Sequence, residues 1–360
     1  MNTLSMSTQL FWKKKTIISY VLSILVFMIH ISTFGQYNHG EGIVSVVNQK
    51  FNFFFTESIS RFAVPMFFIL SGIAFFRNFE VKQYFGKLKS RVFTLLIPYL
   101  AWNTIWMLFD IICSHTFISR FFMGRPIFEI TLPNILNGIF LHKCVIPFWF
   151  ILDLMILIVL SPIIYLIIKN KYVGMVVSFV LSVLLIFNIS LPITMSSHKD
   201  SIIYFITGGI LGKHYFDYLC KKAPVSARIA SGVFLTVIIV LKNIFPDSTY
   251  TVKPFVTTLI YILCAVSLWC IFDAFIDRMK ERPLYTRSFM VFAIHTNVSA
   301  IITKLITIFL PRREELFIPN FIVTIVLTLI LINIFCILLE KFLPTVNYVL
   351  SGKKPVKKKA

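Results

Sequence analysis

Ionisable side chains stand inside long apolar runs of this sequence, where charged groups are rare. They are His30, Arg61, Asp110 and Asp153. Glu57, four residues before Arg61 on the same helical face, can extend this group or pair with Arg61 directly. An ionisable side chain in hydrocarbon is costly unless it is paired or faces a cavity, so each is a functional candidate. An imidazole among carboxylates is a common general base, because a carboxylate can set its tautomer. Proton-coupled transporters use the same residue types.

The apolar runs that carry these residues are long enough to cross a membrane. Of the 360 residues, 58% are hydrophobic and 14% charged, and the mean hydropathy is +0.85. This balance excludes soluble, secreted, disordered and fibrous proteins. Runs of about 20 apolar residues with short polar connections predict an all-α integral membrane protein. The ten predicted spans are 16–34, 56–76, 91–113, 146–168, 172–192, 201–219, 227–245, 254–277, 286–310 and 317–342.

The distribution of lysine and arginine predicts the orientation of these spans. With the N-terminus in the cytoplasm, 24 of the 35 basic residues fall in cytoplasmic segments and nine in outside loops. We therefore expect a bundle of about ten helices with both termini cytoplasmic. The same rule explains the net charge of +20 without a nucleic acid partner. We divide the chain into a transmembrane domain, 1–345, and a basic cytoplasmic tail, 346–360, that contacts anionic lipid.

The predicted spans bring the ionisable residues to the outer half of the membrane. At 1.5 Å per helical residue, His30 lies about 21 Å from the inner edge of a layer about 30 Å thick. Arg61 and Asp153 lie about 24 Å from that edge, and Asp110 about 28 Å. Salt bridges between helices, or side chains that extend to water, are the structural alternative. That alternative suits Glu57 and Asp110 near the boundary better than the deeper His30 and Arg61.

A basic cluster precedes the third span, on the opposite side of the predicted membrane. It consists of Lys82, Lys87, Lys89 and Arg91. Cytoplasmic topology explains it without a ligand. However, the last three alternate at a predicted helix N-terminus, where the helix dipole favours anions, so a phosphate-bearing ligand is an open alternative. His295, about 12 Å into its span, lies between this cluster and the outer group.

Metal and disulfide chemistry have little support in the sequence. The six cysteines are scattered, mostly inside apolar runs, with no CxxC pair and no histidine at zinc-ligand spacing. We therefore expect neither a disulfide framework nor a metal site.

The segment from Ser60 to Gly72 reads SRFAVPMFFILSG. It resembles the most characteristic stretch of the acyltransferase 3 family of membrane-bound carbohydrate acyltransferases. Further pieces occur in the family's order, and the resemblance covers about residues 16–340, which implies the family's ten-helix core. These pieces are His30, Arg91 with Leu96 to Leu100, Phe148 to Leu152 with Ser161-Pro162, Tyr204-Phe205 with Gly208, Gly209 and Gly212, and Phe289 to His295.

The resemblance implies transfer of an acyl group, usually acetyl, from cytoplasmic acyl-coenzyme A to a hydroxyl of a cell-envelope or capsular glycan at the bacterial inner membrane. His30 would deprotonate the hydroxyl or accept the acyl group, and Arg61 would stabilise the oxyanion. Glu57, Asp110 or Asp153 would orient the imidazole, and the sequence does not choose among them. The donor would be bound by Lys87, Lys89, Arg91 and His295.

One position departs from the family's pattern. Family members often have Arg or Lys with ten residues between it and the first-helix histidine, whereas this chain has Ser19 there and its nearest base is Lys15. We expect no attached esterase-like domain, so any second step would need a partner, such as a polysaccharide-assembly protein. Two other functions stay open: an exporter of polysaccharide or lipid-linked sugar, and a non-catalytic scaffold in an assembly complex.

Overall fold

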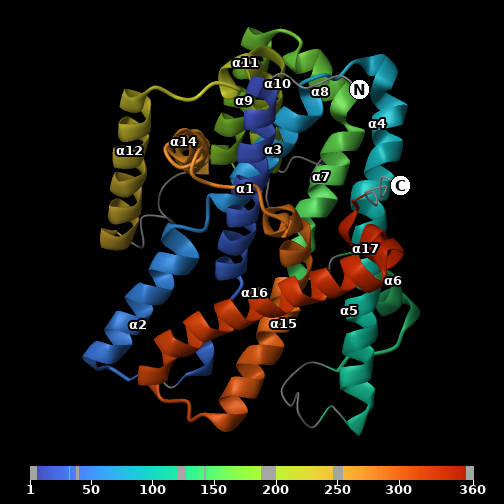
Figure 1. Cartoon of the computed structure of the whole chain (residues 1–360), viewed down its shortest axis with the longest axis vertical. Helices are drawn as coiled ribbons and strands as arrows, with labels where there is room; N and C mark the ends of the chain where they lie inside the picture. Colours follow the sequence, from blue (N-terminus) through green and yellow to red (C-terminus); the bar gives the residue numbers. More distant parts are fainter. Residues whose placement is uncertain are drawn as a thin grey trace.

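Every regular element among the described residues is a helix (Figure 1). The computed structural model describes residues 6–31, 33–37, 40–117, 119, 127–141, 143–187, 200–245 and 254–353. The α-helices are α1 Met6–Ile29, α2 Ile43–Phe53, α3 Ala63–Phe76, α4 Tyr84–Arg91, α5 Ile97–His115, α6 Leu132–Phe140, α7 Trp149–Val159, α8 Ser161–Ile168, α9 Lys171–Leu184, α10 Ser201–His214, α11 Phe216–Leu219, α12 Val225–Ile244, α14 Pro254–Phe272, α15 Ser288–Phe309, α16 Phe317–Phe342 and α17 Pro344–Ser351.

Seven helical stretches of the described chain are long and apolar enough to cross a membrane. They are Met6–Gln36, Ile43–Phe76, Val81–His115, Val225–Ile244, Phe255–Phe272, Pro283–Phe309 and Glu314–Phe342. Helices α7 and α8, bent by 67°, make an eighth if they count as one span. The prediction of ten spans is not confirmed, because α10 has only 14 residues, about 21 Å, and α9 is also short. The cytoplasmic location of both termini stays a prediction.

Helices α3 and α10 pack closely at their glycines. A β-carbon added at Gly212 would lie 2.6 Å from the carbonyl oxygen of Ile73, and one at Gly72 or Gly208 would overlap the backbone of the partner helix. Small residues four apart allow this approach, as is common between helices in membranes. The end of the Ser60 to Gly72 segment therefore has a structural role, which is to hold α3 against α10.

One end of the bundle, which we call the basic end, collects the start of α1 and the ends of α3 and α10. Figure 1 shows α8, α10 and α11 there, at the top, with α2 and the start of α16 at the bottom. The guanidinium of Arg77, at the end of α3, lies 4.2 Å from the ring centroid of Phe216 in α11. The Lys14 ammonium lies 2.7 Å from the Asp273 carboxylate, and both are buried. This ion pair fastens α1 to the segment after α14.

Helix α17 packs beside α5. The indole of Trp102 donates a hydrogen bond to the carbonyl oxygen of Leu350 at 2.9 Å. Gly352, which ends α17, has φ of 67° and lies against the backbone of Thr94, so both its conformation and its surroundings require glycine. Residues 346–353 are thus held on the bundle, and residues 354–360 lie outside the described part. The division of the chain at residue 345 stays a prediction.

Candidate active site

Two histidines that are far apart in the sequence lie side by side. His30 ends α1, where its backbone N–H donates to the carbonyl oxygen of Phe27 at 3.0 Å, and its side chain is half-buried. His295 lies two turns into α15 and is fully buried. The centroids of the two imidazole rings are 5.7 Å apart. The packing of α1 against α15 therefore places His30, from the predicted outer group of ionisable residues, beside His295, which the sequence analysis assigned to the donor site.

The tautomer of His295 follows from the hydrogen bond of its Nδ1. Its Nδ1 lies 3.0 Å from the carbonyl oxygen of Val291, and because a carbonyl only accepts, Nδ1 carries the proton. Nε2 then carries the lone pair, and no described residue hydrogen-bonds this buried atom. Leaving a buried acceptor unpaired costs about 1–3 kcal/mol. A ligand or water that donates to Nε2 would remove that cost.

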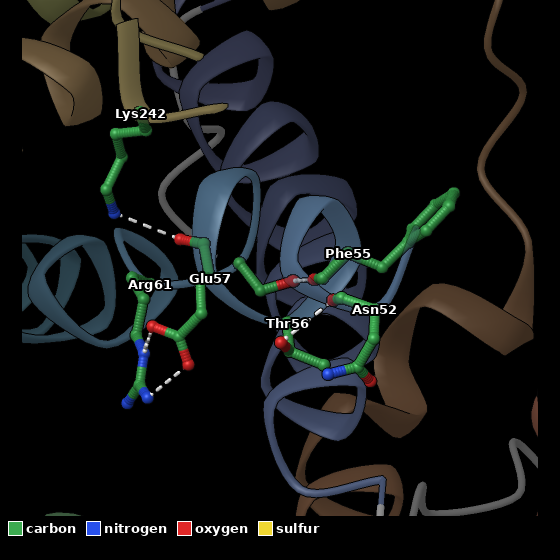
Figure 2. Close-up of polar contacts among 7 residues, drawn as sticks. Asn52, Phe55, Thr56, Glu57, Arg61 and Lys242 are labelled. Atoms are coloured by element: carbon green, nitrogen blue, oxygen red, sulfur yellow. Dashed lines mark hydrogen bonds and ion pairs between the residues drawn. The ribbon is translucent and has the colours of Figure 1, made fainter. Parts of the chain in front are cut away.

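Arg61 and Glu57 form a bidentate pair at the break between α2 and α3 (Figure 2). Arg61 donates from Nε to Glu57 at 2.7 Å and from Nη2 to the other carboxylate oxygen. Glu57 belongs to a π-helical turn, η2 Phe54–Ser58, which is rare and often marks functional sites. From α12, the Lys242 ammonium donates to the carbonyl oxygen of Glu57 at 3.0 Å. Two parallel hydrogen bonds fix the plane of the guanidinium.

The Arg61 guanidinium lies within electrostatic range of the His30 imidazole. Its side chain is 44% exposed and that of Glu57 is 27% exposed, so the pair can be reached from outside the protein. Lys242 and Tyr261, from α12 and α14, interact electrostatically with the same pair. The Arg61 guanidinium and the His30 imidazole, from different helices, thus influence each other electrostatically, and their shared role in a reaction stays a prediction.

The other predicted carboxylates lie on different helices. Asp153, on α7, is buried and accepts a hydrogen bond from the Ser201 hydroxyl of α10 at 3.4 Å. Asp110 is half-buried on α5. Glu57 is engaged by Arg61. Which of the three orients His30 stays a prediction.

The predicted phosphate cluster before the third span is arranged differently from the expectation. Lys87, Lys89 and Arg91 lie in the C-terminal half of α4, so their placement at a helix N-terminus is wrong. The reason is that the helix begins eight residues before the apolar run and continues through η4 Val92–Leu96 into α5. The Lys87 ammonium caps the end of α3, donating to the carbonyl oxygens of Phe75 and Asn78 at 2.9 and 3.2 Å. Lys89 is exposed and Arg91 half-buried.

A cavity at the basic end was not predicted from the sequence. Its volume is about 430 Å³, and it lies between the start of α1 and the segment before α15. It is lined by Gln9, Trp12, Lys13, Thr16, Ile17, Glu281, Arg282, Tyr285 and Thr286. Lys13 and Arg282 are among the basic residues that the charge count placed in cytoplasmic segments. Only the packing of α1 on the segment before α15, which is a tertiary contact, makes them neighbours.

A polar network around the buried Arg287 side chain lies between this cavity and the histidine pair. Arg287 donates to both carboxylate oxygens of Glu340, at 3.1 and 2.7 Å, and to the amide oxygen of Asn333 at 3.3 Å. Asn333 in turn lies 3.5 Å from the Tyr20 hydroxyl on α1. Asn333 therefore links the buried Arg287 guanidinium to Tyr20 on α1. Tyr20 follows Ser19, the position at which the sequence lacks the Arg or Lys that family members often have.

Together, the long apolar helices and the charged groups between them define a multi-pass membrane protein. A family model described as an acyltransferase domain matches residues 20–340. The match covers most of the chain, so the protein belongs to the acyltransferase 3 family. Comparison with curated proteins and with solved structures gave no match. Membership of this family, in a protein of apolar helices, indicates a membrane acyltransferase that uses an acyl donor.

Proposed function

We propose that this protein transfers an acetyl group from cytoplasmic acetyl-coenzyme A to a hydroxyl of a cell-envelope or capsular glycan, at the bacterial inner membrane. The observation that carries the proposal is the His30–His295 pair, with a buried acceptor nitrogen on His295 and the Arg61 guanidinium within electrostatic range. Attack of a hydroxyl on a thioester needs a base that accepts the hydroxyl proton. It also needs a cation that stabilises the oxyanion as it develops.

His30 acts as the base in this proposal. Its neutral imidazole takes the proton of the acceptor hydroxyl while the hydroxyl oxygen attacks the thioester carbonyl carbon. Arg61 stabilises the negative charge that develops on the carbonyl oxygen. The carbon–sulfur bond then breaks, and the proton passes from the imidazolium to the coenzyme A thiolate. Nε2 of His295 accepts a hydrogen bond from the N–H of the His30 ring, and thereby holds the basic nitrogen of His30 toward the hydroxyl.

The donor enters at the basic end. The cavity there offers Lys13 and Arg282 to phosphate groups and the rings of Trp12 and Tyr285 to an adenine base. It lies at the start of α1, whose other end carries His30, and the thioester arm follows α1 past Tyr20. Lys87, Lys89 and Arg91 are a second basic region at the same end for the phosphates, although the Lys87 ammonium already caps α3.

The test is acetyl transfer by the purified protein in detergent. Labelled acetyl-coenzyme A with a glycan acceptor should release free coenzyme A and label the glycan, and His30→Ala should lower turnover by about 10²–10⁴. His115→Ala is the matched control, since this histidine lies on α5 and hydrogen-bonds the backbone of Phe128. Turnover that survives His30→Ala refutes the assigned base. Intact acetyl-coenzyme A, with unmodified glycan retained in cells that lack the protein, supports the exporter instead.

A further inference from the structure

A second cavity at the basic end is separate from the proposed reaction site. Its volume is about 620 Å³, and it lies where the α8–α9 turn meets the end of α10. It is lined by Leu166, Lys169, Asn170, Lys171, Tyr172, His214 and Tyr215. His214 donates from Nε2 to the carbonyl oxygen of Ile168 at 2.7 Å, which ties α10 to α8 and shapes the cavity.

The cavity is suited to an anion. Lys169 and Lys171 both line it, and neither has an ion-pair partner among the described residues. No acidic residue is among the described residues that line it. Lys171 lies 5.0 Å from the ring centroid of Tyr172. Two lysines beside an open polar cavity provide a site for a negatively charged head group.

An apolar groove begins where this cavity ends, because Tyr215 lines both. The groove has a volume of about 270 Å³ and runs between α9, α10 and α14. It is lined by Met175, Ser178, Phe179, Ser182, Ile203, Thr207, Ile210, Leu211, Tyr215, Leu259 and Ile262. Met175 and Phe179 are 45% and 58% exposed, so the groove opens to the outside of the bundle.

The length of this composite site matches one membrane leaflet. From Lys171 to Ser182 along α9 is 11 residues, or about 16 Å. Half of a hydrocarbon layer about 30 Å thick is about 15 Å. A head group held at Lys169 and Lys171 would therefore leave its chain to fill the groove down to the middle of the bilayer.

We propose that this site binds one membrane phospholipid with a net negative head group, its phosphate on Lys169 and Lys171 and one acyl chain in the groove along α9. Charge and shape support this occupant together, since neither a soluble anion nor a neutral lipid would use both halves. The site is distinct from the cavity proposed for the acyl donor, and lipid binding is measured without turnover, so the two proposals stand or fall separately.

Native mass spectrometry of the whole purified protein tests the proposal. Phosphatidylglycerol and phosphatidylcholine of equal chain length are added in detergent, and the bound fraction of each is compared. The protein should prefer phosphatidylglycerol, and Lys169→Glu with Lys171→Glu should weaken its binding by about thirty-fold or more, since each lysine near an anionic lipid is worth about fivefold. Lys280→Glu, at an exposed lysine of the same end, is the control.

The groove is tested by Ser178→Phe, which fills it and should also lower phosphatidylglycerol binding. Ser226→Phe on the exposed side of α12 is the matched control, and elution as a monodisperse peak shows that each variant is folded. Three results would overturn the proposal: equal binding of phosphatidylcholine, displacement of the lipid by free coenzyme A, or retention of a polyprenyl phosphate in preference to phosphatidylglycerol. Loss of binding in both site variants and in neither control supports it.

Discussion

Glu57→Gln tests whether the π-helical turn positions Arg61 for the reaction. With 44% and 27% of the two side chains exposed, the ion pair contributes less than about 1 kcal/mol to stability. Its two hydrogen bonds nevertheless orient the guanidinium. If Arg61 stabilises the oxyanion, Arg61→Ala should lower kcat by about 10²–10³. Glu57→Gln keeps the guanidinium but loosens its placement, and should lower kcat by about tenfold to a hundredfold.

The assay is coenzyme A release at saturating donor and acceptor, with the thermal unfolding midpoint in detergent measured on the same samples. Glu80→Gln is the matched control, because Glu80 forms an exposed ion pair with Lys82 at 2.7 Å, away from the proposed reaction centre. We expect unchanged midpoints in both variants and a loss of kcat in Glu57→Gln alone. Unchanged kcat in Glu57→Gln, or equal losses in both variants, would refute the role given to the turn.

The remaining predictions concern the second histidine, the helix contact and the donor site. His295→Phe should lower turnover while leaving the unfolding midpoint unchanged or higher, because it removes a buried acceptor; a lower midpoint with normal turnover contradicts this. Gly212→Ala should lower the midpoint by separating α3 from α10, whereas Gly232→Ala, whose added carbon meets nothing within 4 Å, should not; equal midpoints contradict the packing argument. Lys13→Glu with Arg282→Glu should raise the donor KM at least tenfold, and Lys280→Glu is the control. A larger rise in KM from Lys87→Glu with Arg91→Glu would instead assign the phosphate site to α4.

Local patterns in the sequence predicted much of the fold and part of the site. Runs of apolar residues predict the helices, since a chain in lipid must satisfy its backbone hydrogen bonds within each segment. Spacing of four residues also predicts that Glu57 can pair with Arg61, and this is confirmed. The prediction that Lys87, Lys89 and Arg91 lie at a helix N-terminus was wrong. It took the start of the apolar run as the start of the helix, whereas the helix begins earlier, at Tyr84.

Other features depend on contacts between segments that are distant in the sequence. The pairing of His30 with His295 requires α1 to pack on α15, and the cavity that holds Lys13 and Arg282 requires the same packing. The placement of Arg287 beside Tyr20 depends on α16 as well. A pattern read along one chain does not contain the rotation of each helix about its axis, so it predicts the depth of a side chain but not its neighbour.

The sequence by itself determined that this protein is helical and that its helices are apolar enough for a membrane, and it predicted similar depths for the ionisable side chains. Family motifs in the sequence determined its class. The tertiary structure decided which of those side chains are neighbours. Helices in a bilayer associate by close packing at small residues such as Gly72 and Gly212, and this packing fixes which faces of the helices point toward one another.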